Sequence, residues 1–225
     1  MSTSFSMLAA LVMGMGSMGY VDCGTGVATP VLDLPASTLE LRPSISDTAK
    51  SPMSKDQLVS VQFYQNGMNI DIADKDSITC NDIRLTSVLG AYRGWVPKVA
   101  PGGSYTFVYS QGGMNTPVAL VVPPRPSLAS PHDGQIVPRA ENYALSYDAA
   151  AGQTVLGRAY DSASTATSYT VPEGDAVTMD TTRLLAGPGH VELLRTYALS
   201  PKNTGFAAVN AEFTIGSQQV GVTWK

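Results

Sequence analysis

Short runs of alternating polar and apolar residues limit what this chain can fold into more than any other feature. Thr38–Arg42 alternates strictly, and Ser104–Tyr109 does so over a longer stretch. Successive side chains of a strand point to opposite faces, so a period of two predicts half-buried strands. The best helical candidate is Asp180–Leu185, which is one turn at most. The sequence therefore predicts an all-β fold.

Turn signals separate these runs. Gln65-Asn66-Gly67 is a hairpin turn signal, and Asn81-Asp82 joins two short strand-like segments, Ser77–Cys80 and Ile83–Thr86. Residues 43–56 are polar and carry two prolines, which predicts a loop. Antiparallel strands joined by short turns of this kind are typical of β-sandwiches.

A proline-rich segment, Pro123–Pro126, predicts a boundary between two domains, because proline cannot continue a strand ladder and stiffens a linker. The 225 residues suit two sandwiches of about 90 residues each. We expect an apolar N-terminal segment and leader at 1–36, one immunoglobulin-like sandwich at 37–124 and a second at 125–225. The strands expected in the second are Tyr143–Tyr147, Val155–Tyr160, Ser168–Val171, Ala176–Met179, Val191–Leu199, Ala207–Ile215 and Val220–Trp224. Seven strands match the immunoglobulin-like number.

The N-terminal segment Met7–Met18 is apolar and too short to span a bilayer. Its length fits the core of a signal peptide, which favours export. However, Met1–Ser6 contains no Lys or Arg, whereas a signal peptide usually begins with positive charge. Two interpretations therefore stay open: an export signal, or a retained apolar strand used in assembly.

The chain has two cysteines, Cys23 and Cys80. In an oxidising compartment two cysteines usually pair, so a Cys23–Cys80 disulfide is one candidate and two unrelated buried thiols are the other. A lipid anchor on Cys23 is disfavoured by Tyr20 and Asp22, which stand where an aliphatic and a small residue are needed. We do not expect membrane anchoring. The absence of a Cys-x-x-Cys motif or a Cys/His cluster argues against a zinc site.

Four segments carry a resemblance to a known group of proteins. They are Ala100–Phe107, Val121–Pro126, Ser130–Gly134 and Val220–Trp224. With them the chain resembles bacterial secreted or surface proteins that carry tandem immunoglobulin-like or fibronectin-type-III-like modules. The resemblance covers about residues 37–225 and implies the sandwich fold and an extracellular or cell-surface location. It implies no enzymatic activity.

Composition and motifs exclude several functions. Charged residues make up only 14% of the chain, the net charge is −4, and Lys and Arg form no run, which argues against nucleic-acid binding. The sequence holds no Gly-x-Ser-x-Gly elbow and no P-loop. Its two histidines, His132 and His190, stand in turn-like contexts, where exposed or turn-bonded imidazoles are expected. We therefore predict a non-enzymatic protein without a cofactor.

Four aspartates, Asp71, Asp74, Asp76 and Asp82, are the candidate metal ligands, and calcium is the ion that their oxygens would suit. Their spacing fits no EF-hand, because the glycine and the closing glutamate are missing. The alternative is a solvated hairpin end, where Asp is favoured for turn hydrogen bonds.

Four aromatic residues, Tyr92, Trp95, Tyr105 and Tyr109, are candidates for a platform on which a sugar ring stacks, with Tyr92 and Trp95 as the leading pair. The alternative is that these aromatics belong to the sandwich core.

Taken together, these features predict an exported structural or adhesive protein of the cell surface, whose partner is another protein or a second copy of itself. Two alternatives remain. One is a subunit of an extracellular filament in which the N-terminal segment adds a strand to a neighbour. The other is a carbohydrate-binding module.

Overall fold

The computed structural model describes residues 19–21, 29–32, 34–47, 55–150, 154–168, 171–172, 174–202 and 204–225. These residues confirm the predicted all-β class. Their one helix is a single 3-10 turn, Ala36–Thr38. No helix among them is long and apolar enough to cross a membrane.

The strands follow one another closely along the chain. They are β1 (Gly19–Val21), β2 (Thr29–Leu32), β3 (Glu40–Asp47), β4 (Asp56–Gln65), β5 (Met68–Ile72), β6 (Ser77–Cys80), β7 (Ile83–Arg84), β8 (Thr86–Val88), β9 (Ala91–Pro97), β10 (Ser104–Gln111), β11 (Met114–Val121), β12 (Leu128–Ser130), β13 (Gln135–Val137), β14 (Tyr143–Ala144), β15 (Ser146–Tyr147), β16 (Thr154–Tyr160), β17 (Thr165–Thr167), β18 (Val171–Pro172), β19 (Thr178–Met179), β20 (Gly187–Leu199), β21 (Ala208–Val209), β22 (Ala211–Gly216) and β23 (Val220–Trp224).

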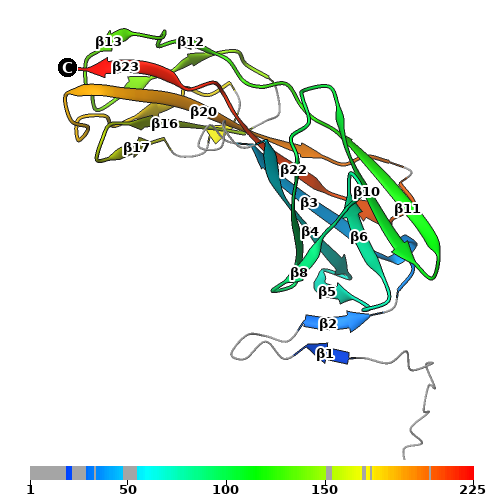
Figure 1. Ribbon diagram of the computed structural model, residues 1–225. Coiled ribbons are helices and arrows are strands. Elements are labelled where there is room, and N and C mark those ends of the chain that lie inside the picture. The colour runs from blue at the N-terminus through cyan, green and yellow to red at the C-terminus, as the bar shows by residue number, and fades with distance from the viewer. Residues whose placement is uncertain are drawn as a thin grey trace, which may run out of the picture.

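One large sheet runs through the whole molecule in the order β1-β2-β5-β4-β3-β22-β20-β16-β17, with β9 attached at β4, β8 at β9 and β23 at β20. A second sheet, β11-β10-β6-β7, covers the first half of it, and the short pairs β12–β15 and β14–β19 lie in the other half. Figure 1 shows the result as a bent, elongated molecule with β20 and β22 passing through the bend.

The predicted turns between β4 and β5 and between β6 and β7 are confirmed. Asn66 and Gly67 have φ angles of 49° and 79°, and Asn81 and Asp82 have φ angles of 47° and 65°. Tight hairpins need this left-handed backbone because its twist matches that of the strands, and Asn, Asp and Gly adopt it most readily. Both sequence signals therefore had a physical basis.

The predicted loop at residues 43–56 is wrong at its start, because β3 continues to Asp47. Pro43 pairs with Val61 of β4, and its side chain continues the buried alternation of β3. On the other side of β3, the pairing with β21 ends at Leu41, and the pairing with β22 starts at Ser44. Pro43 thus lies between two ladders, where its missing N–H breaks no hydrogen bond.

The first hydrophobic core lies between the two larger sheets. It includes Val59, Val61 and Phe63 of β4 and Phe107 of β10, all completely buried. The core also takes side chains from much later in the chain: Tyr197, Phe206, Val209, Ala211, Phe213 and Ile215. The aromatic rings of Tyr105 and Phe213 lie 6.2 Å apart. The first half of the molecule is therefore completed by the C-terminal quarter of the chain.

The second core is smaller and lies in the other half of the molecule. Its members are Val137, Leu145, Val155, Ala159, Val177, Met179, Leu184, Val191, Leu193, Val222 and Trp224. The indole of Trp224 is 1% exposed, and its Nε1 donates a hydrogen bond to the Tyr160 carbonyl at 2.9 Å. This ring fills the centre of the second core.

The two halves share the strand β20. Val191 and Leu193, near its start, belong to the second core, whereas Tyr197, near its end, belongs to the first. From there the chain passes into β22, which lies parallel to β3. The predicted division at residues 124 and 125 differs from this arrangement in one respect: residues 197–215 contribute to the first core, before the chain returns to the second core in β23.

Polar contacts at the bend hold the halves together. Arg125 pairs with Asp47 and donates to the Gly216 carbonyl at 3.1 Å. The Tyr197 hydroxyl donates to the Pro124 carbonyl at 2.8 Å. These contacts fix the proline-rich segment against the large sheet, so the bend is built into the packed structure.

Candidate functional site

The outer face of the large sheet carries the most exposed aromatic side chain of the described residues. Trp95 of β9 is 61% exposed and lies directly opposite Leu58 of β4, which is 40% exposed. Direct partners on neighbouring strands point to the same side of a sheet. The two side chains therefore form an exposed apolar pair.

Hydroxyl side chains continue across the same sheet. Thr154 of β16 faces Thr196 of β20, which faces Thr214 of β22, which faces Ser46 of β3. The hydroxyl oxygens of Thr196 and Thr214 are 3.4 Å apart. Thr154 and Ser46 are exposed, and the two middle threonines are half-buried.

The register joins these two groups into one row. Ser44 pairs with Ser60, and the strands β3 and β4 are antiparallel, so Ser46 comes opposite Leu58. We call the resulting line of six side chains the neutral row. Its members are Trp95, Leu58, Ser46, Thr214, Thr196 and Thr154.

The predicted sugar platform of Tyr92 and Trp95 does not form as a pair. Tyr92 points to the opposite face of β9 and is 7% exposed, with its ring edge against Phe63 in the first core. Burial raises its hydroxyl pKa. The spacing of three residues predicts opposite faces in a strand, so Trp95 alone remains available to a ligand.

The four candidate calcium ligands do not come together. Asp71 is buried and accepts hydrogen bonds from the hydroxyls of Tyr92 at 3.1 Å and Ser87 at 3.4 Å. Asp76 is buried and accepts one from Tyr109 at 3.2 Å. Asp74 is exposed and Asp82 lies in the β6–β7 turn. Within the described part of the chain, no group of three or more acidic, His or Cys residues could hold a metal ion.

Cys80 lies at the end of β6, is completely buried in the first core and forms no disulfide with another described residue. Burial raises the pKa of this thiol to about 12. Cys23 lies outside the described residues, so its pairing with Cys80 stays a prediction.

One buried charged cluster, between β16 and β20, was not among the predicted sites. Glu192 stands inside an apolar run and is completely buried in β20. Its Oε1 accepts a hydrogen bond from the Tyr160 hydroxyl at 2.6 Å and lies 3.6 Å from Nη1 of Arg158. Its Oε2 accepts no hydrogen bond from the described residues. A ligand from solvent cannot reach this carboxylate, which makes the cluster structural.

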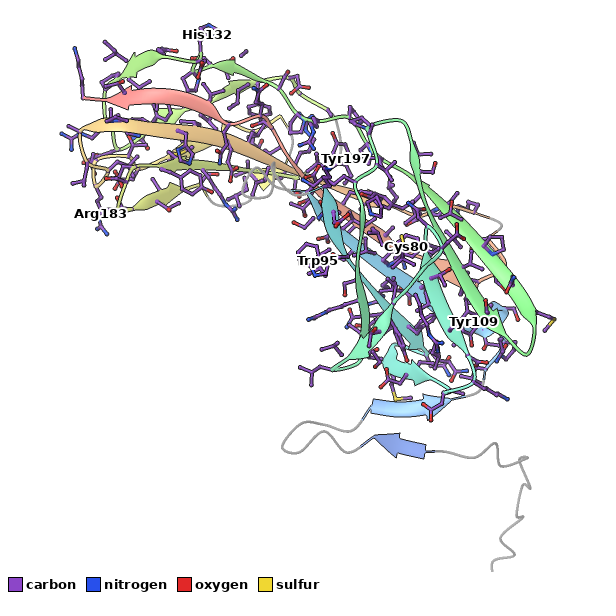
Figure 2. The ribbon with its side chains drawn as sticks, viewed as in Figure 1. Cys80, Trp95, Tyr109, His132, Arg183 and Tyr197 are labelled. Atoms are coloured by element: carbon purple, nitrogen blue, oxygen red, sulfur yellow. The ribbon has the colours of Figure 1, made fainter. Side chains whose placement is uncertain are left out.

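The two histidines differ in their surroundings. His132 is exposed in the turn before β13, as expected. His190 instead lies within β20, half-buried, and its ring stacks on that of Tyr160 with 4.8 Å between centroids. Figure 2 shows His132 at the outer edge of the second half, far from Trp95.

Alkaline pH should weaken the fold through the buried tyrosines. Burial raises the pKa of Tyr143 to about 12, and burial with the nearby Glu192 carboxylate does the same for Tyr160. Below pH 10 both side chains are neutral whether the chain is folded or not. Above pH 10 the unfolded chain ionises first, so the free energy of unfolding should fall from about pH 10 to about pH 12.

Urea unfolding at several pH values, followed by circular dichroism, measures this fall. Tyr160→Phe removes one of the buried groups whose pKa is raised, so its stability should decline less steeply above pH 10 than that of the wild type. Equal slopes for the two proteins would contradict the assignment to Tyr160.

Comparison with known proteins gives no family to which the chain can be assigned. No protein-family model matches it, and no curated protein shows significant sequence similarity to it.

Proposed function

We propose that this chain is an exported, non-enzymatic protein of the cell surface that acts as a stiff adhesive unit built from immunoglobulin-like halves. The observation that carries this proposal is the exposed Trp95–Leu58 pair on the outer face of the large sheet. Trp is strongly enriched among residues that dominate binding energy at interfaces, and an exposed indole gains much from being covered.

The shared sheet supports the adhesive interpretation. Because β20 and β22 connect the two cores, a force or a contact on one half is transmitted to the other through paired strands. The predicted signal-like segment Met7–Met18 supports export. It lies outside the described residues.

Antibodies raised against the purified chain test the location. We expect equal labelling of intact and permeabilised source cells. Labelling that requires permeabilisation would overturn the proposed surface role.

The filament subunit is a second candidate, and the pairing of β2 with β5 favours it. β2 adds to the edge of β5 in parallel register, with Val31 opposite Asp71. The carbonyl of Leu34, just after β2, accepts a hydrogen bond from Nε2 of Gln111 at 2.9 Å. An edge that takes up an N-terminal strand of its own chain offers the same hydrogen bonds to that strand from a neighbour.

Negative-stain microscopy of the same purified protein separates the two candidates. Filaments that disappear when residues 1–32 are removed would favour strand donation. Single particles at every concentration would leave the adhesive unit as the better explanation.

A further inference from the structure

We propose that the neutral row binds an extended, uncharged polysaccharide. This inference rests on the proposed adhesive function and names the chemistry of its ligand. The row consists of one exposed indole, one leucine and four hydroxyl side chains, and it contains no charged residue. Its composition therefore complements a ligand that has hydroxyl groups and apolar C–H faces but no charge.

The length of the row suits a chain rather than a single ring. It crosses the six strands β9, β4, β3, β22, β20 and β16, which lie about 4.8 Å apart, so it extends over about 24 Å. All six side chains stand on one face of a sheet. Trp95 stands on the inner side of the bend, as Figure 2 shows. A linear ligand could therefore lie along the bend.

The charges next to the row do not favour an ionic ligand. In the two rows beside it, Arg93, Glu212 and Asp56 lie on three different strands. On the same face Arg42 is held by Glu40, with 2.7 Å between Nε and Oε1, and its guanidinium lies 3.8 Å from the ring centre of Tyr64. Neither sign dominates, so the face offers no attraction to a polyanion.

A second copy of the chain fits the row less well than a glycan. Homodimer interfaces are more apolar than the rest of the surface, and hydroxyls covered by apolar groups lose their hydrogen bonds with water. Thr196 and Thr214 are already half-buried and share one hydrogen bond, which leaves further capacity for a hydroxyl partner. A sugar chain supplies both donors and acceptors to that position.

Native gel electrophoresis in the presence of dextran, mannan or laminarin tests the proposal on the full chain, with alginate as the charged comparison. We expect at least one neutral polysaccharide to retard the protein. Trp95→Ala should raise the dissociation constant at least about tenfold. Thr214→Val keeps the shape and strand preference but removes one hydroxyl, so it should raise the constant about threefold.

Met114→Ala is the matched control, since Met114 is 70% exposed but belongs to the other sheet. It should leave retardation unchanged. Circular dichroism confirms that each variant is folded. Tryptophan fluorescence gives a second readout, because Trp224 is buried and Trp95 should report sugar contact by a blue shift.

Three results would overturn the proposal: no retardation by any neutral polysaccharide, retardation that Trp95→Ala leaves intact, or a dimer in sedimentation that Trp95→Ala abolishes. Failure of the glycan proposal and failure of the surface role are separate outcomes. A protein labelled on intact cells but not retarded keeps the adhesive role and loses this ligand. A protein that is retarded but absent from the surface keeps this ligand and loses the surface role.

Discussion

A fragment of residues 34–124 will not fold by itself, although the sequence pattern presents it as a complete sandwich. In the whole chain its core is closed by side chains from β21 and β22, among them Val209, Phe213 and Ile215, all at most 3% exposed. Without them one side of β3 loses its partner strand, and the apolar surface that they cover meets water. We expect the free energy lost with this burial to exceed the whole stability of an ordinary small domain.

The fragment should show an unfolded circular dichroism spectrum and poorly dispersed amide resonances. The control is the chain of residues 34–225, which keeps both cores and should unfold in one cooperative transition. A well-dispersed spectrum of the short fragment would show that β22 is dispensable to the first core.

A single substitution probes the same connection within the full chain. Phe213→Ala removes a ring that is 1% exposed and packs beside Tyr105, which should cost about 3–5 kcal/mol. Urea unfolding measures the loss. The destabilised core is the first one, although residue 213 lies in the second half of the sequence.

Local patterns in the sequence predicted the parts of the fold that depend on neighbours in the chain. Alternation located most strands of the second half, and Asn-Gly and Asn-Asp located two turns through their left-handed backbone. The parallel pairing of β22 with β3 joins residues about 170 positions apart. No local pattern encodes such a pairing, because either half offers strands with the same alternation.

The candidate site illustrates the same limit. The pattern around Trp95 is visible in the sequence, but a period of two already places Tyr92 on the other face. The four hydroxyl residues of the neutral row come from four strands that meet only in the folded sheet. This serine and these three threonines are ordinary strand residues until that pairing brings them into line.

Gly189→Ala should destabilise the second core more than any other glycine substitution in it. A Cβ at this position would lie 2.2 Å from Nε1 of Trp224 and 2.3 Å from the Tyr160 carbonyl oxygen. One of these atoms is backbone, and the other belongs to a buried indole that is hydrogen-bonded to that same carbonyl. Neither can move without breaking the contact, so we expect a loss of more than about 3 kcal/mol.

Gly157→Ala is the matched comparison, because its Cβ would also meet the second core but only at the ends of side chains. The nearest atoms are terminal carbons of Met179, Leu145 and Val177, at 2.7–2.8 Å. Side-chain ends, Met179 above all, can move to other rotamers, so this substitution should cost only about 1–3 kcal/mol.

Urea unfolding in a Trp95→Phe background measures both losses, since the remaining fluorescence then comes from Trp224 alone. In the folded Gly189→Ala variant, the emission of Trp224 should shift to the red as the indole leaves its position. In Gly157→Ala the emission should stay close to that of the Trp95→Phe protein. Equal losses, or an unshifted emission in Gly189→Ala, would mean that the bond between Trp224 and Tyr160 does not determine how closely β20 and β23 can pack.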